Sequence, residues 1–192
     1  MTEDLEISLQ RLQAESEHAG PGAAAHVLSR AGDLCLGAGQ RARALAYYGR
    51  AIDACLGARR YNAAAGLCRK LLRVAPGAVR TRCTLAWLAL GRGEIEETRR
   101  EVGGYVEAAT GEEQRRLAAL HLHMMAETTR VPEIRRMLAG HLESLGRVGV
   151  ADDIRATVAD NAMPPALSAH EQELLWRAVV EAATLNPDEL PT

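Results

Sequence analysis

The chain has 192 residues, 47% of them hydrophobic and 25% charged, and a formal net charge of -2, which is ordinary for a soluble domain with a sizeable core. No apolar run approaches the ~18–20 residues that a membrane span needs, and the acidic N-terminus lacks the features of a secretory signal. We therefore expect a cytoplasmic protein without a membrane partner. Lys70 is the only lysine, and this arginine bias fits a bacterial-like base composition as well as it fits a functional preference.

Glycine and proline divide the chain into ten segments of helical length. Alanine, the most frequent residue, favours helix and allows helices to approach closely. The expected helices cover approximately residues 3–17, 23–37, 41–57, 61–75, 78–90, 94–109, 112–129, 132–145, 149–161 and 168–185.

Short links between the segments make successive helices antiparallel neighbours. The pattern predicts an all-α fold, an α-solenoid of about five antiparallel helix pairs. The first helices of the pairs start near residues 3, 41, 78, 112 and 147. A closed ten-helix bundle could share this segmentation, but the regular spacing favours the solenoid. We expect one domain over residues 1–185 and a flexible tail over residues 186–192.

Small and large apolar residues between about 41 and 110 follow the spacing of a known helical repeat. The first match places a turn aromatic and a second helix at Tyr61, Ala64, Cys68, Leu71 and Pro76. The next pair matches at Leu85, Ala86, Ala89, Gly93, Thr98, Val102 and Tyr105. These residues resemble tetratricopeptide (TPR) repeats, and the resemblance implies a right-handed superhelix that binds a peptide or helix in a concave groove.

A second, overlapping register also matches the repeat, and the two registers exclude each other. It runs through Gly32, Cys35, Gly39, Ala44, Tyr48 and Ala51, and makes the segment 41–57 the second member of its pair. The five evenly spaced pairs favour the first register. In that register the first helices line the groove with Gly49, Asp53, Leu56, Arg80, Cys83, Trp87 and Leu90.

Trp87 has two interpretations. A groove tryptophan beside an arginine is typical of a peptide anchor. At helical spacing with Leu85 and Leu88, the same side chain also fits a core position.

Positive charge is concentrated in residues 41–82, which we call the basic band. It holds ten basic residues and one acid, Asp53, a net charge of +9 within a chain of net charge -2. Its candidate surface residues are Arg59, Arg60, Arg69, Lys70 and Arg73. Such a band fits an acidic partner or nucleic acid. It also fits a solvated face whose arginines pair with acids elsewhere, including those of the N-terminal helix.

No motif for nucleotide binding, nucleophilic catalysis or metal binding occurs in the chain. The four cysteines lack close pairs and read as small buried hydrophobes. His121 and His123 lie two apart on a helix and point to different faces. We therefore expect no enzyme, cofactor or metal site, but an adaptor or scaffold that binds another protein. Nucleic-acid binding and a self-assembling structural module remain alternatives.

Overall fold

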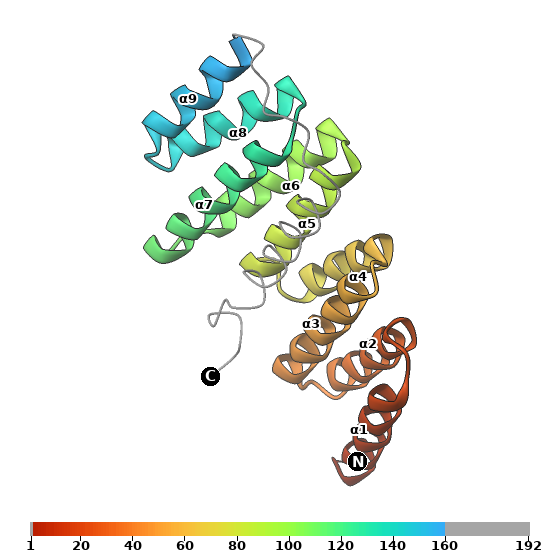
Figure 1. The fold of residues 1–192 in the computed structure, drawn as a ribbon. Helices are drawn as coiled ribbons and strands as arrows, with labels where there is room; N and C mark the ends of the chain where they lie inside the picture. The colour runs from red at the N-terminus through yellow and green to blue at the C-terminus, as the bar shows by residue number, and fades with distance from the viewer. Residues whose placement is uncertain (1, 160–192) are drawn as a thin grey trace. The chain divides into compact units, whose positions relative to one another are not determined.

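The computed structural model describes residues 2–159, and every regular element in this range is an α-helix (Figure 1). The expected helices are confirmed to within a few residues at each boundary. They are α1 (Thr2–His18), α2 (Pro21–Gly37), α3 (Arg41–Gly57), α4 (Tyr61–Val74), α5 (Val79–Arg92), α6 (Ile95–Ala108), α7 (Glu112–Thr128), α8 (Pro132–Ser144) and α9 (Val148–Ala159). The tenth helix, at 168–185, and the tail, at 186–192, lie outside the described residues.

The described helices fall into two compact units, whose boundary lies inside α5. The N-terminal unit holds residues 2–81 and the C-terminal unit residues 82–159. In the N-terminal unit α1 packs on α2, α2 on α3 and α3 on α4, and α2 and α3 share the largest interface. In the C-terminal unit α6 contacts both α7 and α8, and α8 packs on α9. Packing between chain neighbours, with a contact to the next helix but one, is compatible with a helical repeat. One domain over residues 1–185 and the arrangement in five pairs stay predictions.

Three of the connections between helices share one backbone geometry. In each, a residue with positive φ follows the helix, and the next amide donates back to a carbonyl of the last turn, as in a Schellman motif. The positive-φ residues are Gly39 (φ 75), Arg59 (φ 55) and Gly146 (φ 79). The closing bonds run from Gln40 to Cys35, from Arg60 to Cys55 and from Arg147 to Leu142, each 2.8 Å long. Because this turn reverses the chain within three residues, each helix returns against its predecessor.

Alanine and cysteine fill the interior where helices cross. Ala64, Ala86 and Ala89 are completely buried, as the sequence predicts for close helix contacts. All four cysteines are free and buried, which confirms their assignment as small hydrophobes. Burial raises the pKa of the Cys68 thiol to about 12, so this side chain is a neutral core residue at physiological pH.

Gly32 of α2 faces the ring of Tyr48 of α3 at the interface between these two helices. A Cβ atom at position 32 would lie 2.5 Å from Tyr48 Cε1 and 2.7 Å from Cδ1. The tyrosine cannot move aside, because it is completely buried. This contact pairs α2 with α3 and therefore supports the second of the two repeat registers.

The Tyr48 hydroxyl ties the same crossing to α4. It donates to Asp33 Oδ1 over 2.7 Å, and Lys70 Nζ lies 2.6 Å from that oxygen. Lys70 also donates to Ser29 Oγ over 3.0 Å and sits over the Tyr48 ring, 4.8 Å from its centroid. Although partial burial opposes it, hydrogen bonding to Lys70 and Tyr48 lowers the pKa of Asp33. Side chains of α2, α3 and α4 thus meet in one polar cluster beside the apolar core.

Replacing Gly32 with alanine is expected to destabilise the protein by about 1–3 kcal/mol, because the added methyl group overpacks the α2–α3 crossing. The matched control is Gly66→Ala in α4, where a Cβ atom meets nothing within 4 Å. That change should stabilise the protein by about 0.5–1 kcal/mol through helix propensity. Urea unfolding measures both variants, and equal effects of the two substitutions would contradict the close approach.

Candidate functional site

The candidate groove residues of the N-terminal unit are Gly49, Asp53, Leu56 and Arg80. Gly49, Asp53 and Arg80 are half-buried, whereas Leu56 is buried. Arg80 donates to Asp53 and forms an ion pair with it. Burial raises the pKa of Asp53, and the charge of Arg80 offsets only part of that rise. Asp53 and Arg80 therefore contact each other within the unit, and Leu56 belongs to its core.

The candidate groove residues of the C-terminal unit are Cys83, Trp87 and Leu90. Cys83 and Trp87 are buried and Leu90 is half-buried. Only 4% of Trp87 is exposed, and its indole Nε1 has no hydrogen-bond partner among the described residues. Of the two interpretations of Trp87, the described structure fits the core position and not an exposed peptide anchor.

Most basic side chains of the basic band lie on the surface. Arg59, Arg60, Arg69 and Arg73 are exposed, and Lys70 is half-buried within the polar cluster. Arg60 donates to the carbonyl of Gly22 over 3.0 Å, which links the start of α4 to α2. The structure thus places four of the five predicted patch residues where a partner could reach them.

Part of the charge of the basic band is neutralised within the N-terminal unit. Arg43 pairs with Glu6 of the acidic helix α1, in an exposed contact between both carboxylate oxygens and the guanidinium. Lys70 pairs with Asp33, and Arg80 with Asp53. The expectation that arginines of the band pair with acids elsewhere, including those of the N-terminal helix, is confirmed for Arg43. The acid that pairs with Arg80 lies inside the band itself.

A buried cluster in the C-terminal unit joins Cys83 of α5, Tyr105 of α6 and His121 of α7. His121 Nδ1 lies 2.8 Å from the Tyr105 hydroxyl and 3.3 Å from Cys83 Sγ. The two rings are stacked at a centroid distance of 6.1 Å. Sequence reasoning missed this cluster because its members are 16 and 38 residues apart and form no motif.

The protonation state of His121 determines the hydrogen bonds within the Cys83–Tyr105–His121 cluster. Burial lowers the pKa of His121, so the imidazole is neutral near pH 7. In the tautomer with its proton on Nε2, Nδ1 accepts from the tyrosine hydroxyl and, more weakly, from the thiol. All three side chains are less than a tenth exposed. His123 is exposed and points elsewhere, as its spacing predicts.

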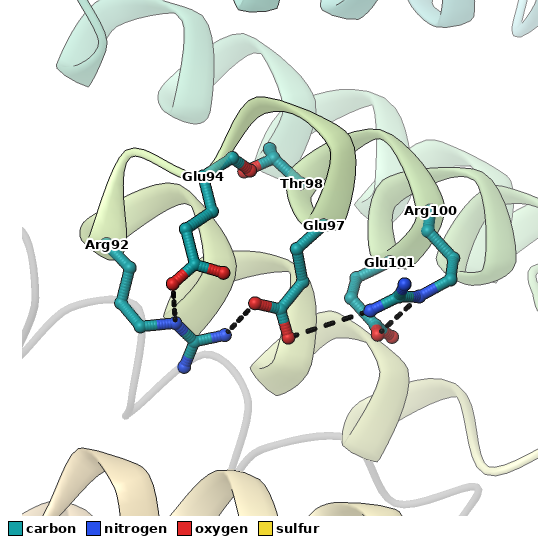
Figure 2. Close-up of polar contacts among 6 residues, drawn as sticks. All are labelled: Arg92, Glu94, Glu97, Thr98, Arg100 and Glu101. Atoms are coloured by element: carbon teal, nitrogen blue, oxygen red, sulfur yellow. Dashed lines mark hydrogen bonds and ion pairs between the residues drawn. The ribbon is translucent and has the colours of Figure 1, made fainter.

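A charged network covers the junction of α5 and α6 (Figure 2). Arg92 reaches Glu97 over 2.7 Å and Glu94 over 3.6 Å, and Arg100 reaches Glu101 over 3.3 Å. The carboxylates of Glu97 and Glu101 are mostly shielded, with side-chain exposures of 14% and 12%. Shared, partly buried pairs of this kind hold a junction more firmly than isolated surface pairs. Through Arg92, the network links the end of α5 to the start of α6.

Arg135 of α8 is the largest fully buried side chain of the described residues. Its guanidinium donates to the carbonyls of Ala126 and Thr129 at the end of α7, and to Thr157 Oγ1 of α9 over 2.9 Å. The C-terminal end of a helix carries partial negative charge, so these carbonyls at the end of α7 replace the carboxylate that a buried arginine usually requires. One side chain thus joins three helices of the C-terminal unit.

No family model, curated protein or solved structure matches this chain. The likeness to TPR repeats rests on the residues that carry it and on the packing of neighbouring helices. None of the described helices is long and apolar enough to cross a membrane.

Substituting Arg135 with alanine is expected to lower the free energy of unfolding by about 2–4 kcal/mol, because buried carbonyls lose their donor and a cavity opens. Arg136→Ala removes an exposed neighbour and should change it by less than about 0.5 kcal/mol. Chemical denaturation compares the two, and similar losses would show that Arg135 does not join the three helices.

The stability of the protein should fall as pH decreases below about 6.5, the pKa of an unfolded histidine. Because the pKa of folded His121 is lower, the unfolded state binds more protons in this window, and protonation favours unfolding. The fall ends once pH passes the folded pKa. Unfolding free energies are measured from about pH 7 to about pH 5. In His121→Gln they should depend less on pH than in the wild type, whereas the exposed control His123→Gln should show the pH dependence of the wild type. An unchanged slope in His121→Gln would refute this assignment.

Proposed function

We propose that this chain is a non-catalytic, TPR-like module that binds an acidic segment of another protein through the exposed arginines of α3 and α4. In this proposal the helices form about five pairs in a right-handed superhelix. Support comes from the packing of chain neighbours and from the recurring turn after α2, α3 and α8.

The side chains that could act as nucleophile or base are packed between the described helices, which supports a binding role. The cysteines are buried, and burial raises the pKa values of Cys35, Cys55 and Cys68, so reactive thiolate is disfavoured. His121 is enclosed between Tyr105 and Cys83. A nucleophile and its base need access to substrate, and these groups lack it.

The observation that carries the proposed surface is the exposure of its arginines. Arg69 and Arg73 lie four residues apart on α4, so they share one helix face, and both are exposed. Arg50 on α3 and Arg59 in the turn add two further exposed charges. A surface of one sign attracts and orients a partner of the opposite sign. An acidic helix or extended acidic peptide matches this chemistry.

Aromatic exposure favours a protein partner over nucleic acid. Single-stranded nucleic acid is bound by stacking bases on exposed aromatic rings between basic residues. The aromatic residues of the basic band are Tyr47, Tyr48 and Tyr61. Tyr47 and Tyr48 are 8% and 0% exposed, which leaves Tyr61, at 36%, for stacking. The band therefore supplies charge with little stacking surface.

The test compares a fluorescein-labelled glutamate-rich peptide with a single-stranded oligonucleotide of equal charge. Fluorescence anisotropy should show peptide binding that weakens with salt and falls about tenfold or more in the double variant Arg69→Glu, Arg73→Glu. The matched control, Arg130→Glu with Arg136→Glu, changes the same net charge at exposed positions of the C-terminal unit and should bind the peptide like the wild type.

Three outcomes would overturn the proposed function. Equal loss in both double variants would show that net charge alone attracts the peptide. Much tighter binding of the oligonucleotide would favour the nucleic-acid alternative. A salt-insensitive dimer in size-exclusion chromatography with light scattering, with no peptide binding, would favour the self-assembling module.

A further inference from the structure

A surface hollow of about 460 Å³ lies in the C-terminal unit, where α7 begins and α8 ends. It is distinct from the basic band, which lies on other helices. Seven of the eight residues that line it are exposed, so it is open to solvent. The polar residues of its lining are Thr110, Glu112, Arg115, Arg116, Ser144 and Arg147.

The lining carries three guanidinium groups and one carboxylate, that of Glu112. Arg116 contacts Glu113 over 3.2 Å, but both side chains are about two-thirds exposed, so the pair is weak. Arg115 and Arg147 have no side-chain partner among the described residues. Two uncommitted guanidiniums therefore border one hollow, from the first turn of α7 and from the turn after α8.

The helix ends at the hollow carry charge of both signs. α7 begins at Glu112, and its N-cap residue Gly111 has no side chain to cap the first amides, but the Gly111 amide donates to Gln114 Oε1 over 3.3 Å. Glu112 and Glu113 in the first turn offset part of the positive charge at this end of the helix. The end of α8 has the opposite polarity, but its last carbonyls are occupied. Gly146 donates to Glu143 over 2.9 Å and Arg147 to Leu142 over 2.8 Å. The preference of the hollow for an anion therefore rests on its guanidinium groups and not on the helix ends.

We propose that this hollow binds the phosphate group of a phosphorylated serine or threonine in a peptide segment. A phosphate carries nearly two negative charges and three acceptor oxygens, so Arg115 and Arg147 can each donate to it in bidentate geometry. The Thr110 hydroxyl supplies a further donor. Sites for free small molecules enclose most of their ligand. An open hollow lined by exposed residues suits instead a charged group on a longer chain.

The experiment titrates the full chain with a short fluorescein-labelled alanine- and glycine-rich peptide that carries one central phosphoserine. Parallel arms use the unphosphorylated peptide and inorganic phosphate. Anisotropy should show binding of the phosphopeptide, and Arg115→Gln with Arg147→Gln should weaken it about tenfold or more. The matched control is Arg130→Gln with Arg136→Gln, which should bind like the wild type. In ¹⁵N–¹H spectra the amides of Gly111 and Gly146 should shift on binding.

Each remaining outcome would overturn this proposal. Equal affinity for the phosphorylated and unphosphorylated peptides would exclude phosphate recognition. Inorganic phosphate that binds as tightly as the phosphopeptide would show a small-anion site and no peptide docking. Shifts confined to amides outside α7 and α8, or an undiminished affinity of the Arg115 and Arg147 double variant, would place the anion elsewhere. Binding through Arg69 and Arg73 is tested by other variants, so the two proposals stand or fall separately.

Discussion

The contact between Gly32 and the ring of Tyr48 sets the spacing at which α2 and α3 pack, and the N-terminal unit is built around that spacing. A hydrogen atom in place of a side chain lets the ring lie against the α2 backbone, where it is completely sealed from solvent. The tyrosine hydroxyl, held inside, then needs a polar partner, which Asp33 provides. Asp33 in turn draws in Lys70 of α4. The space that Gly32 leaves for the Tyr48 ring thus accompanies a polar cluster built from side chains of α2, α3 and α4.

The helices could be predicted from the sequence because their signals are local. Glycine and proline mark the ends, alanine favours the interior, and the boundaries agree with the structure to within a few residues. The repeat register was harder to assign, because both registers use the same small residues. The contact at Gly32 involves a ring sixteen positions away, and this contact between α2 and α3 is visible only in the three-dimensional structure.

Candidate site residues were less predictable, because their roles depend on partners distant in sequence. Trp87 could be an anchor or a core residue on periodicity alone, and burial decides between them. Arg135 resembles any other surface arginine of a charged helix, yet it enters the core because the end of α7 offers carbonyls there. The excess of basic residues in the band could be counted from the sequence. Its partial neutralisation by Glu6, Asp33 and Asp53 depends on packing.

The recurring turn also bears on how the chain folds. A reversal closed by backbone amides within three residues brings successive helices together across a short loop, so little entropy is lost in forming each hairpin. Contacts dominated by chain neighbours give a low contact order, which is associated with rapid folding. Within the N-terminal unit, folding can then start at the hairpin with the largest interface, α2 with α3, and extend to its neighbours. Within the N-terminal unit α1 packs on α2, and a helix held by one neighbour detaches more readily by local unfolding than a helix held by two.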